Sequence, residues 1–139
     1  MVGSGTVQAP KRPRVLIVED FALIQEGIRS VLQRDCDVVG TVEDGKSAME
    51  AVSALDPDIV TLDVSLPDVS GFTLAERLQK AHSPAKVIFI TAYPDRAYAD
   101  RAFEIGAKAY LLKAAIHREL PDAIRKVMAG GLYRSVLIH

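Results

Sequence analysis

Five polar side chains, each at the end of a short apolar run, are the residues of this sequence best suited to do chemistry. They are Glu19, Asp20, Asp63, Thr91 and Lys113. An ionised Asp is a competent nucleophile toward phosphorus, and carboxylates packed closely together repel unless a cation such as Mg2+ relieves them. A Lys ammonium and a Thr hydroxyl can both contact phosphoryl oxygens. These residue types predict that an acid captures a phosphoryl group with the help of magnesium.

The apolar runs before these residues have the composition of buried strands, and they alternate with segments of helical period. We predict strands over 14–18, 37–42, 59–62, 86–90 and 109–112. The segments between them repeat apolar residues every three or four positions, which is the period of one helix face. Five strand–helix units joined by short connections predict an α/β fold, a single doubly wound parallel sheet with five helices.

The carboxyl edge of this sheet is where the five polar residues are expected to meet. In a doubly wound sheet, ligands bind outside the carboxyl ends of the strands, at the point where the strand order reverses. With the order 2-1-3-4-5, the first and third strands are neighbours, and the three carboxylates share one crevice with Thr91 and Lys113. Every group needed for phosphoryl capture would then lie in one place.

Composition and charge exclude several classes of protein. The 139 residues fit one domain, and 49% hydrophobic with 25% charged residues is typical of a soluble globular protein. The net charge of -1 offers no general attraction to nucleic acid, and no apolar run approaches the roughly 18 residues of a membrane span. Cys36 is the single cysteine, so an internal disulfide is impossible and a reducing compartment is favoured. We expect a cytoplasmic protein without a membrane anchor.

The chain divides into three expected segments. Residues 1–13 lack the continuous apolar core of a signal peptide and are expected to form a flexible leader. The basic cluster at 11–14 is interpreted as solvated charge before the first strand. Residues 14–131 are expected to form the domain, and 132–139 a short C-terminal tail or truncated linker.

Four motifs, taken in order, resemble those of the receiver domain family of response regulators (CheY-like). They are Val-Glu-Asp at 18–20, Leu-Asp-Val-Ser-Leu-Pro at 62–67 followed by Gly71, Thr-Ala at 91–92, and Gly-Ala-Lys-Ala-Tyr-Leu-Leu-Lys at 106–113. The spacings of 43, 28 and 22 residues between the second acid, the third acid, the threonine and the lysine also fit. The resemblance covers about 14–131 and implies a flavodoxin-like fold.

The resemblance also implies a role for each residue of the phosphorylation site. Glu19 and Asp20 resemble the acidic pair that holds Mg2+, and Asp63 resembles the phospho-acceptor and third metal carboxylate. The backbone carbonyl of Ser65 resembles the remaining protein ligand of the metal, and Lys113 resembles the lysine that contacts the phosphate.

A second group of residues resembles the family's switch. Thr91 and Tyr110 resemble the pair that responds to phosphorylation, and Ser65 and Tyr93 resemble positions that tune how readily water reaches the phosphate. Many receivers have a cis-proline after the lysine, whereas here Ala114 follows, so we expect that turn to be absent.

The residues at 123–133 resemble the last helix of the subfamily usually linked to a LuxR-type helix-turn-helix output domain, which implies a part in transcription regulation. Only six residues follow Tyr133, so we expect either a stand-alone receiver or an excised fragment. The implied partners are a histidine kinase, an output domain in a longer parent protein, and a second copy. The copy would dock through the fourth helix, fifth strand and fifth helix, or through the first and fifth helices. This chain itself is not expected to contact nucleic acid.

Two other functions use the same residue types. A phosphohydrolase of the haloacid dehalogenase type also has an Asp nucleophile and Mg2+, but it typically carries a second acid two residues on as a general acid-base, where this chain has Ser65. A pseudo-receiver would have the fold without phosphorylation. We therefore predict a signalling phospho-acceptor in a two-component system, with at most slow autophosphorylation and self-dephosphorylation, and not an enzyme.

Taken singly, several of these residues have a structural explanation. Asp20, Asp63 and Thr91 are residue types that often cap helices or stabilise turns, and Tyr110 lies in an apolar strand where an aromatic usually packs in the core. The functional interpretation therefore depends on their joint placement at the strand ends.

Overall fold

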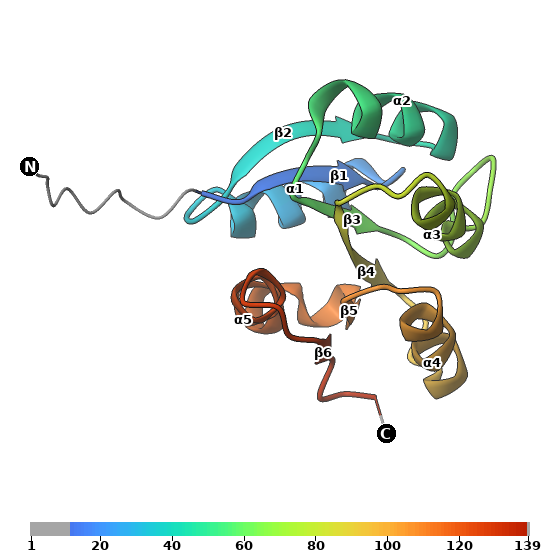
Figure 1. Cartoon of the computed structure of the whole chain (residues 1–139). Coiled ribbons are helices and arrows are strands. Elements are labelled where there is room, and N and C mark those ends of the chain that lie inside the picture. The colour runs from blue at the N-terminus through green and yellow to red at the C-terminus, as the bar shows by residue number, and fades with distance from the viewer. Residues whose placement is uncertain (1–11, 139) are drawn as a thin grey trace, which may run out of the picture.

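A parallel sheet of six strands forms the centre of the molecule, with the order β2-β1-β3-β4-β5-β6 (Figure 1). The computed structural model describes residues 12–138. Its strands are β1 (Arg14–Val18), β2 (Asp37–Val42), β3 (Ile59–Leu62), β4 (Lys86–Thr91), β5 (Ala109–Leu112) and β6 (Tyr133–Arg134). Neighbouring strands are parallel throughout. The predicted five strands and their order 2-1-3-4-5 are confirmed, and β6 is an addition at the edge.

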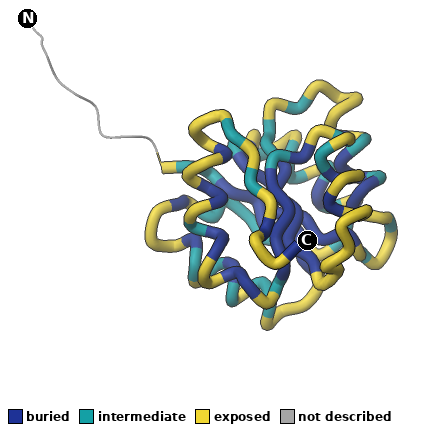
Figure 2. Tube along the Cα trace, turned by 90° about the horizontal axis from the view of Figure 1, so that it is seen from below, coloured by how far each residue is buried: buried dark blue, intermediate teal, exposed yellow. Residues whose placement is uncertain are grey.

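Five α-helices cover the two faces of the sheet. They are α1 (Ala22–Leu32), α2 (Gly45–Leu55), α3 (Gly71–Lys80), α4 (Arg96–Glu104) and α5 (Ile116–Met128), with a short 3-10 turn η1 (Lys113–Ala115) before α5. Buried residues of α1 and α5 pack together on one face, and those of α2, α3 and α4 pack on the other. The tube in Figure 2 shows the strands as the buried centre between these two layers.

Alternation along β1 explains why the strands read as continuous apolar runs. Val15 and Ile17 belong to the core on the α1 and α5 face, whereas Leu16 and Val18 belong to the core on the opposite face. Successive side chains of a strand point to opposite faces, and both faces here are covered by helices. Most positions of such a strand are therefore apolar.

Helix ends lie where the local chemistry predicts. The side chain of Ser70 accepts a hydrogen bond of 3.2 Å from the backbone N–H of Phe72 and caps the start of α3. Asp56, just before Pro57, ends α2 in the left-handed conformation. Gly106 after α4 has a φ of +106°, a value that glycine adopts without steric cost. No cis peptide bond occurs in residues 12–138. This agrees with the prediction for the turn after Lys113, where Ala114 takes the place of the proline that many receivers have.

Most of the predicted leader lies outside the described residues, and both described ends make contacts that the sequence did not reveal. Residues 1–11 and His139 lie outside the described residues. Arg12, interpreted from sequence as a solvated charge, donates to the Asp37 carboxylate (2.9 Å) and to the carbonyls of Gln33 and Cys36. In the tail, Tyr133 and Arg134 form β6, which is too short to show the period of a strand in the sequence.

Within residues 12–138, no helix combines the length and the apolar character that crossing a bilayer requires.

Gly71 fixes the loop that carries Asp63, and it generates a stability prediction. Its N–H donates to the carbonyl of Val64 (2.7 Å), and a Cβ at Gly71 would lie 2.0 Å from the carbonyl oxygen of Asp63. Because the obstacle is backbone, Gly71→Ala must shift the loop. We expect this change to lower the free energy of unfolding by about 1–3 kcal/mol or more, measured by urea denaturation.

Gly27 provides the matched control for this substitution. It lies within α1, and a Cβ there would meet nothing within 4 Å. Gly27→Ala should raise the free energy of unfolding by up to about 1 kcal/mol because alanine favours the helix. A Gly71→Ala protein as stable as Gly27→Ala would contradict the proposed constraint on the loop.

Candidate functional site

Three carboxylates meet at the carboxyl ends of β1 and β3. Glu19 and Asp20 follow β1 and Asp63 follows β3, and one carboxylate oxygen from each lies within 4.8 Å of those of the other two. The two strands are hydrogen-bonded neighbours, so the predicted convergence of these acids is confirmed. Glu19 and Asp63 are only 1% and 5% exposed, whereas Asp20 is exposed. The cluster is therefore buried on one side and open to solvent at Asp20.

Lys113 bridges the two buried acids. Its Nζ lies 2.6 Å from Oδ2 of Asp63 and 2.9 Å from Oε1 of Glu19. Burial alone would lower the pKa of Lys113, but its hydrogen bonds to Asp63 and Glu19 outweigh this effect and raise the pKa. Lys113 is therefore held as a cation, and it offsets part of the negative charge of the cluster.

Glu19 is fixed from several directions. Its Oε2 accepts from the backbone N–H of Phe21 (3.0 Å), and its own carbonyl accepts from the side-chain amide of Gln25 (2.5 Å). Burial raises the pKa of Glu19, although the hydrogen bonds from Lys113 and from the Phe21 N–H act in the opposite direction. Glu19 thereby holds Lys113 in place beside Asp63. The Gln25 contact has no signal in the sequence, because a polar residue on a helix is ordinarily solvated.

The donor set of this cluster suits a small divalent cation. Three carboxylates offer oxygen atoms, and Lys113 is the cation that lies beside them. Magnesium prefers oxygen ligands and retains several of its waters. The exposed Asp20 gives such an ion access from solvent. Ser65 lies beside the cluster, since its backbone N–H donates to Oδ1 of Asp63 (3.2 Å). The role of its carbonyl as a metal ligand stays a prediction.

Thr91 contributes a buried hydroxyl at the end of β4. The residue is fully buried, and its Oγ1 has no hydrogen-bond partner among the described residues. Buried hydroxyl groups are nearly always paired, because an unpaired one costs free energy. The Thr91 hydroxyl is therefore an available hydrogen-bond donor at the end of β4, the strand that pairs with β3.

Tyr110 lies inside the molecule. It is fully buried, and its hydroxyl donates to the carbonyl of Tyr93 (2.8 Å), in the loop after β4. Burial is the main cause that raises the pKa of Tyr110 well above its ordinary value. The structure therefore has the side chain of this predicted switch residue in an inward position.

Tyr93 connects the loops that follow β3 and β4. Its hydroxyl and the Ser65 hydroxyl are 2.9 Å apart, and its ring packs edge to face against Tyr98 of α4. Ser65 and Tyr93 are the two positions that the resemblance associates with access of water to Asp63. Their contact was not evident from the sequence, where 28 residues separate them.

Asp68 has an anchoring contact that its position next to Pro67 does not reveal. Its carboxylate accepts from the backbone N–H groups of Gly45 (2.8 Å) and Lys46 (3.1 Å) at the start of α2. The bond from Gly45 is the main cause that lowers the pKa of Asp68. The loop after Asp63 is thereby tied to a neighbouring helix.

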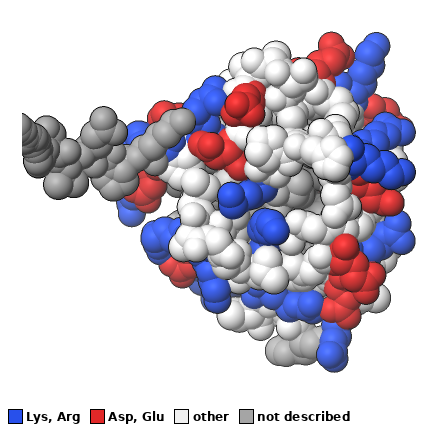
Figure 3. Space-filling view, viewed as in Figure 1, with Lys and Arg blue, Asp and Glu red and all other residues white. Residues whose placement is uncertain are grey.

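Charges of both signs are interspersed on the face shown in Figure 3, without a large patch of one sign.

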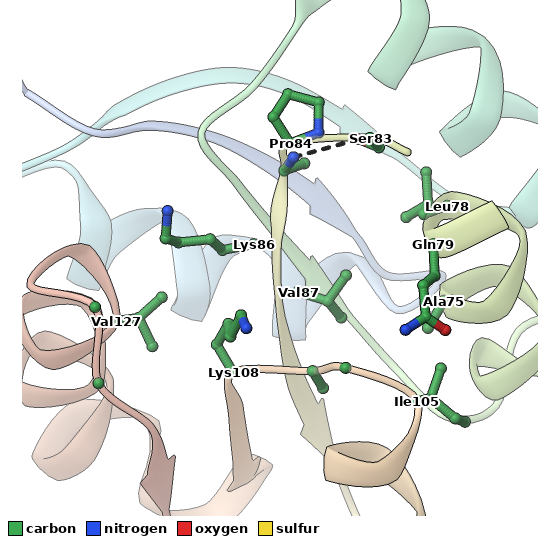
Figure 4. A pocket seen from close by; sticks show the side chains of 15 residues that line it. Ala75, Leu78, Gln79, Ser83, Pro84, Lys86, Val87, Ile105, Lys108 and Val127 are labelled. Atoms are coloured by element: carbon green, nitrogen blue, oxygen red, sulfur yellow. Dashed lines mark hydrogen bonds between the residues drawn. The ribbon is translucent and has the colours of Figure 1, made fainter. Parts of the chain in front are cut away.

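A cavity of about 430 Å³ lies at the amino ends of β4 and β5 (Figure 4), and Lys86 and Lys108 are among its lining residues. Neither the acidic cluster nor Lys113 lines it. This cavity is therefore separate from the candidate site.

Comparison with protein families identifies one match along most of the chain. The model of the response regulator receiver domain matches residues 15–125. The transcriptional regulatory protein YvfU of Bacillus subtilis (strain 168) is 36% identical over 119 residues, which cover 84% of this chain and 60% of the relative. The response regulator GacA of Pseudomonas viridiflava is 34% identical over 125 residues, 88% of this chain and 58% of the relative. The chain thus spans about three fifths of these curated relatives.

Solved structures agree with this assignment. A two-component response regulator of the LuxR family from Aurantimonas sp. SI85-9A1 superposes with a TM-score of 0.87 at 29% identity, covering 92% of this chain and 93% of that one. The family consists of signalling proteins of two-component systems rather than classical enzymes. The fold, the matched residues and the relatives together show that this chain belongs to the receiver domain family of response regulators.

Proposed function

We propose that Asp63 accepts a phosphoryl group in a magnesium-dependent reaction and that a histidine kinase is the natural donor. The observation that carries this proposal is the buried Asp63 carboxylate, held 2.6 Å from Lys113 within a cluster of three acids. A nucleophile beside a fixed cation suits phosphoryl transfer, in which positioning and charge neutralisation supply most of the catalysis.

In the proposed step, a carboxylate oxygen of Asp63 forms a bond to phosphorus while the bond from phosphorus to the donor breaks. The broken bond is P–N when phosphohistidine is the donor, and P–O when acetyl phosphate is the donor and acetate leaves. Lys113, which already forms an ion pair with Asp63, neutralises negative charge on the incoming phosphoryl group. Asp20 and Asp63, with the Ser65 carbonyl and a water held by Glu19, would bind Mg2+. When bound, the ion neutralises charge on the phosphoryl oxygens.

The response to phosphorylation is proposed to begin at Thr91. Its unpaired hydroxyl can donate to a phosphoryl oxygen on Asp63, which would satisfy a buried donor. Because Tyr110 is already buried, we propose that phosphorylation stabilises the inward position rather than creating it. A local change of charge would thereby bias the packing of α4, β5 and α5.

The wider role follows from the relatives and belongs to the same proposal. Residues 14–131 would act as the receiver, and the parent protein would couple it to a helix-turn-helix output domain that regulates transcription in the cytoplasm. A second copy would dock through α4, β5 and α5, or through α1 and α5. YvfU and GacA, which are longer than this chain, support this view because they are described as a transcriptional regulatory protein and a response regulator.

Intact mass spectrometry tests the phosphoryl transfer. After incubation with acetyl phosphate and Mg2+, we expect one added phosphoryl group, on Asp63, the buried acid that lies nearest to Lys113 (2.6 Å). The adduct should be lost in Asp63→Asn and when Mg2+ is omitted. Full labelling of Asp63→Asn would reject Asp63 as the acceptor.

Thermal or urea unfolding with Mg2+ tests the metal site. At a Mg2+ concentration of about 100 times Kd, the wild type should gain about 2.7 kcal/mol. Asp20→Asn should lose most of this gain, and without Mg2+ it should be more stable than the wild type because one repelling charge is gone. Glu50→Gln, an exposed acid of α2, is the control and should retain the gain. An equal gain in Asp20→Asn and the wild type would contradict the site.

Hydrolysis of an aryl phosphate distinguishes the phosphohydrolase alternative. We expect no rapid multiple turnover, because Ser65 stands where such enzymes carry a general acid-base. Many turnovers per minute that disappear in Asp63→Asn would favour the hydrolase.

A further inference from the structure

A buried acid of α5 anchors the C-terminal segment, residues 132–138. Glu119 is 5% exposed, and it accepts hydrogen bonds from the hydroxyls of Tyr133 (3.0 Å) and Ser135 (2.9 Å) and from the N–H of Val136 (3.2 Å). Burial and the bond to Glu119 raise the pKa of Tyr133 to about 12, so its hydroxyl remains a donor at neutral pH. All three donors belong to the C-terminal segment. A buried acid is tolerated when hydrogen bonds of this kind satisfy it.

The same segment is also attached to α4, on the other side of β5. Arg134 forms an ion pair with Asp100 (2.6 Å), and its guanidinium lies 5.2 Å from the ring centre of Phe103. Ile138 is buried in the core on the α2, α3 and α4 face. The C-terminal segment therefore runs from α5 across the edge of β5 toward α4, and its path can be followed from the label β6 to the C-terminus in Figure 1.

The backbone of β5 connects this segment to the proposed switch residue. The N–H of Ser135 donates to the carbonyl of Tyr110 (2.9 Å), and the N–H of Tyr133 donates to the carbonyl of Lys108 (2.9 Å). The Tyr110 hydroxyl in turn bonds to the carbonyl of Tyr93, in the loop after Thr91. Ile138 and Tyr110 belong to one buried cluster. A rotation of the Tyr110 side chain would thus change the packing of the cluster that holds Ile138, beside the strand pairing that positions the segment.

We propose that the C-terminal segment is a latch closed by Glu119, and that its docking is coupled through Tyr110 to phosphorylation of Asp63. This inference rests on the proposed function. The docked segment packs beside an inward Tyr110, and phosphorylation is proposed to favour that same position. Since coupling between two sites is reciprocal, phosphorylation tightens the latch, and an open latch weakens the phosphorylated state. The docked segment covers the edge of β5 between Asp100 of α4 and Glu119 of α5.

Amide hydrogen exchange measured by NMR tests the latch at Ser135 and Val136. Beryllium fluoride with Mg2+ serves as the phosphoryl mimic. In the wild type it should slow exchange of both amides. Glu119→Gln should speed their exchange by about tenfold, as expected for losing a hydrogen bond to a charged group, and should reduce the response to beryllium fluoride. Amides of β1 should keep their protection, which shows that the variant is folded.

Asp122→Asn is the matched control on the same helix. Asp122 is exposed and forms an ion pair with Arg125, three residues on, so this variant should exchange like the wild type. If Glu119→Gln also exchanges like the wild type at Ser135 and Val136, Glu119 is not the anchor and the latch is wrong.

The response of the Ser65 amide separates the latch from the proposed function. A shift at Ser65 on adding beryllium fluoride, with unchanged exchange at Ser135 and Val136, would reject the coupling and leave phosphorylation of Asp63 standing. The absence of any response around Asp63 would reject the proposed function, and the latch would be rejected with it.

Discussion

The ion pairs of Lys113 with Asp63 and Glu19 are the interaction on which the site depends. Two acids almost inaccessible to solvent would be strongly destabilising without a cation, and Lys113 supplies it at 2.6 and 2.9 Å. The three residues come from the ends of β1, β3 and β5, so the pairing requires the strand order of the sheet. The chemistry therefore depends on the topology, because this parallel order brings the three strand ends to one edge of the sheet.

The loops around this centre are held by contacts that leave Asp63 little freedom. Gly71 allows the backbone to approach the Asp63 carbonyl, and Asp68 ties the same loop to the start of α2. Tyr93 joins it to the loop after β4 through Ser65. A fixed acceptor, together with the movement proposed for Tyr110, would be a physical basis for a switch, since a small local change can bias a packed element with two arrangements.

The sequence was sufficient to predict the five strands, because buried parallel strands have a strong apolar signal. Their order came from the doubly wound fold that the strand–helix alternation and the resemblance imply, and the convergence of the strand-end residues followed from that order. It was insufficient for β6, since two residues show no period, and for Glu119, which reads as an ordinary helix acid. The inward position of Tyr110 depends on side-chain packing over long sequence distances. The role of each site residue in phosphorylation stays a prediction, although the structure brings Glu19, Asp20 and Asp63 together with Lys113.

The most direct test of the account is a crystal structure of the chain with Mn2+ and beryllium fluoride, in which anomalous scattering locates the metal. The account predicts a metal peak between the carboxylates of Asp20 and Asp63 and the Ser65 carbonyl. It also predicts beryllium fluoride on Asp63, within hydrogen-bond distance of Thr91 and Lys113. An Asp63 without the adduct while beryllium fluoride binds elsewhere, or a metal peak away from these acids, would contradict it.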